Sequence, residues 1–545
     1  MSSPPRPTRD AQGLTHGPTW LPVPRTHAEH LVKRGWRERR TLSELLRAQV
    51  RSRPEHLALV AGDVRLTYAD LDLHAERCAD VLRTHGVQPG DRVLLCVGNR
   101  AEHVVAFYAA VRAGAVPVLV LPTLGDADVR AVAVAAEVSA AVVVERQGRR
   151  DLRDLAVSLR ALPHVRAVLR PQDLDVRSTP RATPPTGSGR DDADAEDLAL
   201  LTLSGGTTGT PKLIPRTHAD YGYNALASAR ACGVGPDAVY LAVLPAAHNF
   251  TMVSPGIVGV LSSGGTVVLS PDPSPTTAFA LVERERVTLT SLVPALVPAW
   301  LDEARRTPAD LGSLRILQVG GARLDDATAR RVGPELGCTL QQVFGMAEGL
   351  NCYTDPAGSP DVVCTTQGRP VSPGDEVLVV DEQDRPVPDG TPGELLTRGP
   401  YTITGYYGAR ELDTVRFTAD GFYRTGDVVT RSPDGDLTVV GRVKDQVNRA
   451  GEKIAAGEVE ELLLARPDVR GAAVVGAPDP HLGERSVAFL VVDGPGPTRE
   501  DLRRDLTGRG VTAIAVPDEV RVVAGLPLTG VGKVDKQRLR AWAQA

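Results

Sequence analysis

The stretch Ser204-Gly205-Gly206-Thr207-Thr208-Gly209-Thr210-Pro211-Lys212 combines the residue types that hold a phosphate group. Its glycines let the backbone approach an anion closely and adopt positive φ angles. Its hydroxyl side chains add hydrogen-bond donors, and Lys212 adds a positive point charge. The spacing differs from GxxxxGK[ST], so this is not the common P-loop. Taken alone, the stretch also fits a surface hairpin, and the rest of the chain must decide.

The elements around this stretch alternate between strands and helices. An apolar run over 198–203 predicts the buried strand that leads into it. The pattern predicts further strands at 93–97, 116–121, 240–244, 265–269, 288–292 and 316–319, and helices at 68–84, 101–113, 276–285 and 325–332. This alternation favours an α/β fold, with parallel or mixed sheets sandwiched by helices in a large N-terminal domain.

Two smaller units follow the large sheets. Strand patterns at 376–380 and 393–397 predict a β subdomain. The final residues predict a small α+β domain, with helices at 457–464 and 499–506 and strands at 469–475, 486–492 and 519–523. We therefore divide the chain into a flexible arm (1–25), a large domain (26–440), a hinge (441–446) and a small C-terminal domain (447–545).

The composition narrows the class of protein. The chain has 545 residues, of which 42% are hydrophobic and 24% charged, as in globular proteins. The net charge of −5 and the aromatic content of 4% give no support for binding to nucleic acid or an anionic membrane. The six cysteines are scattered without metal-ligand spacing, and no run of apolar residues is long enough to span a membrane. We expect a cytoplasmic protein.

Five further signatures follow the glycine-rich stretch in a fixed order. They are Gly320-Gly321-Ala322, Phe344-Gly-Met-Ala-Glu348, Tyr423-Arg-Thr-Gly-Asp427, Gly441-Arg442-Val-Lys444 and Gly530-Val-Gly-Lys533. Together they resemble the core motifs of the adenylate-forming superfamily, which includes acyl-CoA synthetases, luciferases and adenylation domains of nonribosomal peptide synthesis. The resemblance covers most of the chain after residue 40.

A second group of residues resembles one branch of that superfamily. Ala247-His248-Asn249-Phe250, Ser254-Pro255-Gly256 and the Gly349-Leu350 that follows Glu348 are similar to the stand-alone aryl acid–AMP ligases. Ala347 also matches that branch, because Thr is usual in other members. Such ligases activate 2,3-dihydroxybenzoate or salicylate for siderophores and related peptides.

The resemblance implies two steps that use ATP and Mg²⁺. The acid first attacks the α-phosphate of ATP, which gives an aryl-AMP and pyrophosphate. A phosphopantetheine thiol then attacks the aryl-AMP and gives a thioester. Because no carrier motif follows Lys536, the resemblance implies an aryl carrier protein that is supplied in trans.

The resemblance also assigns roles in ATP binding. Lys533 reaches the α-phosphate during the first step, Glu348 binds Mg²⁺, Asp427 accepts hydrogen bonds from the ribose, and Lys444 is the hinge residue. The expected nucleotide-binding set is Ser204, Gly205, Gly206, Thr207, Thr208, Gly209, Lys212, Gly320, Gly321, Ala322, Val343, Asp427, Arg442 and Lys533. The expected catalytic residues are Lys533, Lys212, Glu348 and His248.

The same comparison predicts the acid pocket. Asn249 matches the amide that binds the ortho hydroxyl, Ser254 is placed to reach a second ring substituent, and His248 is expected beside the carboxylate. The predicted substrate residues are His248, Asn249, Phe250, Ser254, Gly320, Gly321, Met346 and Asn351. Individually, several of these residues also fit ordinary structural positions, such as a packed histidine after a strand.

Two departures from the branch leave alternatives open. Thr251-Met252-Val253 and Asn351-Cys352 stand where other residues are usual. If Asn351 faces the ring, 3-hydroxypicolinate or a hydroxyanthranilate becomes a credible acid, since a ring nitrogen or an amine could pair with the additional amide. An aryl-CoA ligase is an alternative in the same superfamily. A non-catalytic nucleotide-binding scaffold is an alternative of another class, which the presence of Lys533, Glu348 and Asp427 disfavours.

Overall fold

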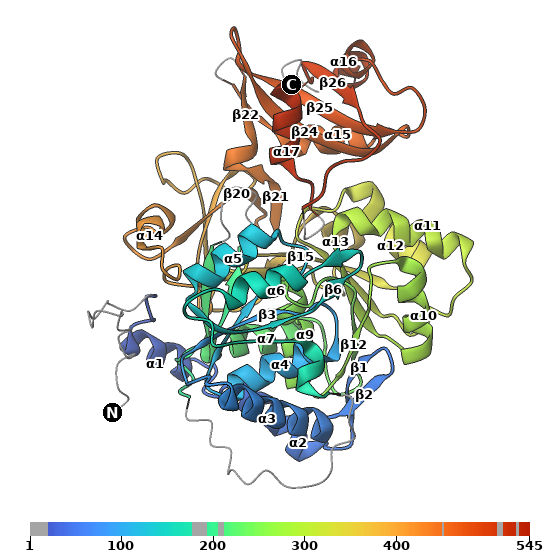
Figure 1. Ribbon diagram of the computed structural model, residues 1–545. Coiled ribbons are helices and arrows are strands. Elements are labelled where there is room, and N and C mark those ends of the chain that lie inside the picture. Colours follow the sequence, from blue (N-terminus) through green and yellow to red (C-terminus); the bar gives the residue numbers. More distant parts are fainter. Residues whose placement is uncertain are drawn as a thin grey trace.

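Two large sheets with helices between and around them form most of the molecule (Figure 1). The structure is a computed structural model, and it describes residues 20–176, 193–204, 212–449, 452–508, 516–529 and 533–544. Over these ranges, the predicted α/β architecture with a smaller C-terminal domain is confirmed. None of the helices in these ranges is both long and apolar enough to cross a membrane.

The first sheet carries the strand that leads into the glycine-rich stretch. Its strand order is β10-β9-β4-β3-β5-β8, and its strands are parallel except for β10, which is antiparallel to β9. The bounds are β3 Arg92–Cys96, β4 Val116–Leu119, β5 Val138–Val143, β8 Ala167–Leu169, β9 Leu198–Leu203 and β10 Leu213–Thr217. Helices α5 (Asp126–Ala135) and α6 (Arg153–Arg160) pack on this sheet.

The second sheet is also parallel in its centre. Its strand order is β17-β16-β15-β14-β13-β11-β12-β1-β2, with antiparallel pairs at both edges. The bounds are β1 Leu57–Ala61, β2 Val64–Thr67, β11 Val239–Ala242, β12 Thr266–Leu269, β13 Leu289–Leu292, β14 Ile316–Gly320, β15 Thr339–Gly345, β16 Asn351–Tyr353 and β17 Arg369–Pro370. Helices α10 (Pro275–Glu285), α11 (Val297–Arg306), α12 (Asp326–Leu336) and α13 (Pro360–Thr365) cover its outer face.

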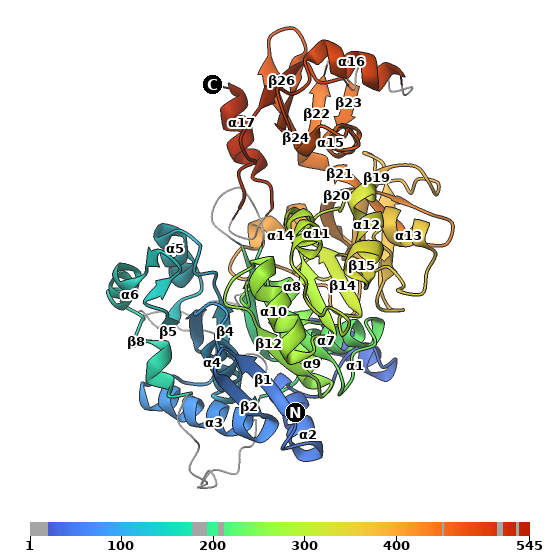
Figure 2. The same ribbon diagram turned by 90° about the vertical axis from the view of Figure 1, so that its right-hand side faces the viewer.

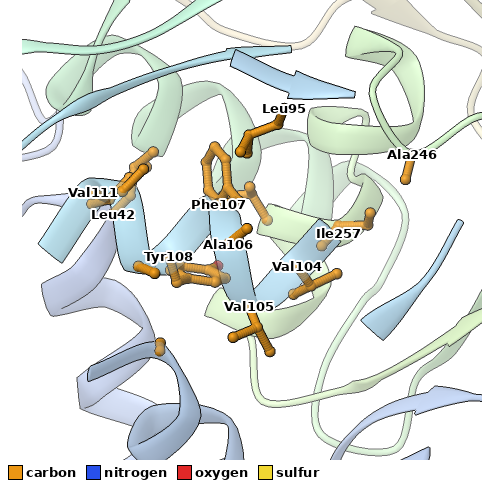
Figure 3. Packing of buried hydrophobic residues seen from close by; sticks show 14 of the residues in the cluster. Leu42, Leu95, Val104, Val105, Ala106, Phe107, Tyr108, Val111, Ala246 and Ile257 are labelled. Carbon is orange, nitrogen blue, oxygen red and sulfur yellow. The ribbon is translucent and has the colours of Figure 1, made fainter. Parts of the chain in front are cut away.

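A layer of helices fills the space between the two sheets. It contains α2 (Leu42–Ser52), α3 (Tyr68–Thr84), α4 (Ala101–Arg112), α7 (His218–Ala231), α8 (Asn249–Val253) and α9 (Gly256–Ser262). Helix α4 is buried on nearly all sides, as its continuous apolar sequence requires. Figure 3 shows Val104, Phe107 and Tyr108 of α4 among Leu42 of α2, Leu95 of β3 and Ile257 of α9. This packing fixes the two sheets relative to each other.

The predicted β subdomain is an antiparallel sheet of order β18-β19-β20-β21. Its strands are β18 Glu376–Val380, β19 Gly393–Arg398, β20 Tyr423–Arg431 and β21 Leu437–Arg442, and α14 (Arg410–Arg416) precedes β20. The chain then passes through the short helix η3 (Val443–Asp445), inside the predicted hinge. The hinge role and the domain boundaries remain predictions.

The C-terminal domain has one sheet with helices on both faces. Its elements are β22 Gln446–Arg449, β23 Glu452–Ala455, α15 Ala456–Leu464, β24 Val469–Asp479, β25 Gly483–Val492, α16 Arg499–Gly508, β26 Glu519–Val522 and α17 Lys536–Gln544. Alternate residues of β24 face opposite sides, so that Val474 packs with α15 and Val475 packs with α17. Figure 2 shows this domain beside the large domain, with the segment before α17 reaching toward it.

The large domain also contains several short elements. They are α1 Arg25–Lys33, β6 Arg146–Gln147, β7 Arg150–Asp151, η1 Pro171–Leu174 and η2 Pro294–Leu296.

Candidate active site

The candidate site lies where strands of the large domain end and the C-terminal domain approaches. Strand β9 ends at Leu203, β14 at Gly320 and β15 at Gly345. In parallel sheets, ligands bind outside the carboxyl ends of the strands, because the loops there converge. Three of the signatures named above, which begin at Ser204, Gly320 and Phe344, lie at these ends.

The glycine-rich stretch connects an antiparallel strand pair. The Ser204 backbone N–H donates to the Lys212 carbonyl at 3.0 Å, and the Lys212 N–H donates to Ser204 Oγ at 3.2 Å. The stretch therefore joins two antiparallel strands, as the hairpin alternative expects. The two ends of this connection, Ser204 and Lys212, lie in the candidate site. The predicted residues Gly205, Gly206, Thr207, Thr208 and Gly209 lie outside the described residues.

Lys212 stands in a charged and partly buried environment. Its ammonium lies 5.0 Å from the ring centroid of Tyr406, an attractive cation–π arrangement. Burial lowers the pKa of Lys212, and the nearby charges of Arg416 and Lys444 lower it further, while Glu348 opposes them. The predicted pyrophosphate lysine and the predicted Mg²⁺ carboxylate are thus neighbours.

Glu348 is held by a tyrosine pair. Glu348 is 8% exposed, and Tyr406 donates its hydroxyl hydrogen to Glu348 Oε1 at 2.9 Å. The hydroxyls of Tyr406 and Tyr423 are 3.0 Å apart. Burial and the Glu348 carboxylate raise the pKa of Tyr406 far above its usual value, so this hydroxyl stays a hydrogen-bond donor. The pair fixes the orientation of the carboxylate.

Glu348 fits a magnesium site of the kind that a nucleotide completes. Across the parts of the chain that the structure describes, no cluster of three or more His, Cys, Asp or Glu residues could hold a metal alone. Mg²⁺ in nucleotide sites usually takes one or two carboxylates, with the remaining ligands from phosphates and water. An oriented Glu348 carboxylate beside Lys212 meets that requirement.

Asp427 and Arg442 form an ion pair across two neighbouring strands. Register places Asp427 of β20 opposite Arg442 of β21, and Arg442 Nε lies 2.7 Å from Asp427 Oδ1. Asp427 is 4% exposed, so burial raises its pKa, and the charges of Arg442 and Lys533 oppose that shift. The predicted ribose acceptor is therefore buried and held next to a guanidinium.

Lys533 enters this site from the C-terminal domain. A Cβ atom placed on Gly321 would lie 3.3 Å from Lys533 Cε, so the absence of a side chain at Gly321 leaves room for the lysine. Burial lowers the pKa of Lys533 to about 8, with a further decrease from Arg442 and an opposing effect from Asp427 and Glu348. The lysine thus lies within electrostatic range of both carboxylates.

The carboxyl end of β14, at Gly320, packs closely against the hydrophobic residues Phe250 and Val343. A Cβ on Gly320 would lie 3.1 Å from the Phe250 ring and 2.7 Å from the Val343 carbonyl oxygen. Phe250 and Val343 belong to one buried cluster. The structure therefore brings together Gly320, Gly321, Val343 and Phe250, and Ala322 follows directly in the chain. Met346 is only partly buried, at the edge of two other hydrophobic clusters.

His248 caps the start of α8. Its Nδ1 accepts a hydrogen bond from the Phe250 N–H at 3.3 Å. Burial lowers the pKa of His248 to about 4, and the charge of Lys533 contributes to the decrease. The imidazole is therefore neutral at physiological pH. It caps a helix and lies within electrostatic range of Lys533, and its place beside the substrate carboxylate remains a prediction.

The predicted acid-binding residues contact helix α7. Tyr221 donates its hydroxyl hydrogen to Asn249 Oδ1 at 3.0 Å, which leaves the Asn249 amide hydrogens available. Asn351 Nδ2 donates to Ser254 Oγ at 3.2 Å and to Asn224 Oδ1 at 2.8 Å. Tyr221 and Asn224 are three residues apart, so they lie on the same face of α7.

Lys444 lies in η3, between the two domains. Burial lowers the pKa of Lys444, followed by the effect of Arg442. Arg540 of α17 pairs with Asp445 and donates to the Lys444 carbonyl at 3.3 Å. The predicted hinge residue is thus joined to the last helix.

Four of these residues were given no role from the sequence: Tyr406, Tyr423, Tyr221 and Asn224. Tyr423 begins one of the recognised signatures, and that position was a usable signal. Tyr221 and Asn224 are three residues apart in α7, and this helical spacing puts the two polar side chains on one face. For Tyr406, we find no signal in the sequence.

Two family models match the chain. The model described as "AMP-binding enzyme" matches residues 46–407, and the model described as "AMP-binding enzyme C-terminal domain" matches residues 458–533.

Individual relatives match over nearly the full length. The chain is 44% identical over 529 residues to a 2,3-dihydroxybenzoate-AMP ligase of Bacillus subtilis, covering 96% of this chain and 97% of the relative. It is 45% identical over 529 residues to a salicyl-AMP ligase / salicyl-S-ArCP synthetase of Mycobacterium tuberculosis, covering 95% of this chain and 94% of the relative. Among solved structures, the Mycobacterium smegmatis MbtA apo structure matches with a TM-score of 0.72 and 43% identity, covering 96% of this chain and 98% of that chain.

Proposed function

The chain belongs to the AMP-binding enzyme family, and on that premise we propose that it activates an ortho-hydroxy aryl carboxylic acid with ATP. The aryl-AMP then passes to the phosphopantetheine thiol of a carrier protein, in siderophore or nonribosomal peptide synthesis. The similarity to the salicyl-AMP ligase / salicyl-S-ArCP synthetase supports both the acid class and the acceptor. We also infer a cytoplasmic location, where ATP is available and where the six buried free thiols would stay reduced.

One observation carries this proposal: the C-terminal domain places Lys533 against Gly321, within electrostatic range of Asp427, Glu348 and His248. A lysine in a nucleotide site stabilises negative charge that develops during the attack on phosphorus. Because the charge comes from a separate domain, it can be present for one step and withdrawn for the next.

The first step needs no protein nucleophile. A carboxylate oxygen of the acid attacks the α-phosphorus of ATP, and the bond between that phosphorus and the pyrophosphate oxygen breaks. Lys533 neutralises charge on the α-phosphate, and Lys212 neutralises charge on the departing pyrophosphate. Glu348 would hold Mg²⁺, which when bound neutralises phosphate charge.

The nucleoside part is held by the β subdomain. Asp427 accepts hydrogen bonds from the ribose hydroxyls, and the charge of Arg442 favours the ionised form of the buried Asp427 carboxylate. Gly320 and Gly321 let flat rings lie close to the backbone.

The acid lies between Phe250 and helix α7. Asn249 presents amide hydrogens to the ortho hydroxyl, because its oxygen is already occupied by Tyr221. An acid without the hydroxyl leaves this amide unpaired, at a cost of about 1–3 kcal/mol. In the second step, the thiol sulfur attacks the carbonyl carbon, and AMP leaves.

Acid-dependent exchange of pyrophosphate into ATP tests the first step. We expect exchange with salicylate or 2,3-dihydroxybenzoate to be about 5- to 150-fold faster than with benzoate, which leaves the amide of Asn249 unpaired. Equal rates with benzoate would remove the role of Asn249, and no exchange with any aryl acid would refute the proposal.

The acceptor is tested by giving the preformed aryl-AMP to CoA and to phosphopantetheinylated carrier proteins. A preference for CoA would favour the aryl-CoA ligase alternative.

A further inference from the structure

Arg216 is a buried charged residue that takes no part in the steps proposed for the reaction. It lies on β10, four residues after Lys212, and its side chain is 0% exposed. Its Nε donates to Asp220 Oδ1 of α7 at 2.8 Å. Removing a guanidinium from water is costly, so a buried arginine needs hydrogen-bond partners within the protein. The other partners of Arg216 indicate which parts of the chain it holds.

The two terminal nitrogens of Arg216 join two separate segments of the chain. Nη1 donates to the Ala347 carbonyl at 2.8 Å, and Nη2 donates to the Tyr401 carbonyl at 3.1 Å. Ala347 directly precedes Glu348, and Tyr401 begins the segment 401–406. Hydrogen bonds from an ionised donor are about twice as strong as those between neutral groups. One guanidinium therefore ties both segments to β10.

The second of these segments holds Glu348 directly. The Ile403 N–H donates to the Glu348 carbonyl at 2.8 Å, and Tyr406 donates its hydroxyl hydrogen to the Glu348 carboxylate. A Cβ on Gly349 would lie 2.6 Å from Thr402 Cα, so the two backbones are in close contact. The orientation of the Glu348 carboxylate therefore depends on how the two segments lie against each other, and the guanidinium joins them.

Arg216 also contacts the acid side of the site. Its guanidinium carbon lies 5.2 Å from the ring centroid of Tyr221, a cation–π arrangement, and Tyr221 donates to Asn249 Oδ1. Replacing Arg216 can therefore change the acid pocket as well as Glu348. An effect on Glu348 has to be measured without the acid.

We propose that Arg216 is a positioning residue for Glu348 and thereby strengthens the binding of the Mg²⁺ that accompanies ATP. This inference rests on the proposed function, because it takes Glu348 as the Mg²⁺ ligand. Replacing a residue that orients a metal ligand typically costs about 10- to 100-fold in metal affinity. Since Arg216 acts through the backbone beside Glu348, we expect the lower end of that range, about 10-fold.

Binding of ATP in the absence of any acid tests the proposal, because no aryl-AMP forms. The quantity measured is the Mg²⁺ midpoint, the Mg²⁺ concentration that gives half of the maximal gain in ATP affinity. It should rise about 10-fold in Arg216→Met, whereas the Kd for ATP in EDTA should change less than threefold. An unchanged Mg²⁺ midpoint would overturn the proposal.

Arg112→Met is the matched control for loss of a buried arginine. The Arg112 side chain is 1% exposed and pairs with Asp72 between α4 and α3. Its replacement should lower the thermal stability and leave the Mg²⁺ midpoint unchanged. A rise in the midpoint as large as that in Arg216→Met would overturn the proposal, because it would show a general effect of stability.

Arg216→Lys separates the charge of the side chain from its hydrogen bonds to the two segments. Lysine keeps a positive charge beside Asp220, which limits the loss of stability, but its compact ammonium does not span the Ala347 and Tyr401 carbonyls. We expect the Mg²⁺ midpoint to rise about 10-fold here as well. A wild-type midpoint would overturn the proposal. This variant carries the test if Arg216→Met does not fold.

Hydrogen–deuterium exchange gives a readout that needs no ligand. In protein without metal or nucleotide, the backbone amides of 346–351 and 401–406 should exchange faster in Arg216→Met than in Arg112→Met. Equal exchange in these two segments would overturn the proposal.

The outcomes for this proposal and for the proposed function remain distinct. If wild type binds ATP with a Mg²⁺ midpoint that both Arg216 variants share, only the role of Arg216 is overturned. If wild type exchanges no pyrophosphate with any aryl acid, the proposed function is overturned, and the role of Arg216 in it as well.

Discussion

The ion pair between Arg323 and Glu461 connects the two domains. We predict that disrupting this pair weakens domain docking to an extent that depends on pH. Arg323 follows the Gly320-to-Ala322 turn, and Glu461 lies on α15 of the C-terminal domain. Arg323 Nη1 is 2.7 Å from Glu461 Oε1, and the side chains are 17% and 34% exposed. Breaking this contact should affect the delivery of Lys533.

The pKa of Glu461 determines the sign of the effect. Burial raises this pKa from 4.5 to about 7, and the charge of Arg323 only partly opposes the increase. A group with a raised pKa stabilises the docked state fully below its undocked pKa, near 4.5, and loses that contribution as pH rises through about 7. Docking should therefore weaken between pH 6 and pH 8.

Arg323→Met would leave the carboxylate without its partner. Removing one partner of a fully buried pair costs about 3–5 kcal/mol, and exposed pairs contribute about 0–1 kcal/mol. Since Glu461 is about one third exposed, we take about 1–2 kcal/mol, or about 5- to 30-fold in the docked fraction. This loss applies above pH 7, where Glu461 is charged. At pH 6 we expect the docked fraction to fall by less than threefold. Glu461→Gln should retain docking at both pH values.

Single-turnover formation of aryl-AMP at pH 6 and pH 8, expressed relative to wild type at each pH, measures this effect. Arg330→Met is the matched control, because Arg330 pairs with Asp361 at 2.8 Å within the large domain and both side chains are well exposed. A loss for Arg323→Met that is equal at both pH values, or larger at pH 6, would refute the reasoning.

Three further predictions concern the site itself. Because the pKa of Lys533 is lowered to about 8 and the charged form is the active one, kcat/KM for ATP in adenylation should fall as pH rises through about 8. Lys533→Arg should shift that fall above pH 10. An unchanged pH profile in this variant would argue against Lys533 as the group that titrates. Tyr406→Phe removes the hydrogen bond to Glu348 but keeps the ring beside Lys212, so the concentration of Mg²⁺ for half-maximal rate should rise about 10-fold with little change in thermal stability; an unchanged Mg²⁺ dependence would contradict the role of the tyrosine. Asn249→Leu should lower kcat/KM for salicylate about 5- to 150-fold and affect benzoate little, whereas equal losses for the two acids would indicate a packing role.

Local signals in the sequence were sufficient for most elements of the fold. The helix predicted at 68–84 has those bounds as α3, because Thr67 caps its start and the chain reverses at Gly86 with φ +82°. The strand predicted at 198–203 is β9, a short apolar run between polar segments.

Contacts between distant segments could not be read from the sequence. The pairing of Asp427 with Arg442 depends on the register of β20 and β21, and a one-residue shift would separate the two. Asn351 and Asn224 are 127 positions apart, and only the packing of α7 against β16 brings them together. The sequence therefore indicated candidate site residues, but it could not predict the partners that they contact.

The central claim is that Lys533 serves the first chemical step and not the second. The most direct test is to measure both steps in Lys533→Ala: aryl-AMP formation from ATP and salicylate in a single turnover, and transfer of the aryl group from preformed salicyl-AMP to a carrier thiol. We predict a loss of about 100- to 1000-fold in the first step, as for removal of one charge-stabilising donor, and less than threefold in the second. Equal losses in both steps, or no loss in the first, would contradict the claim.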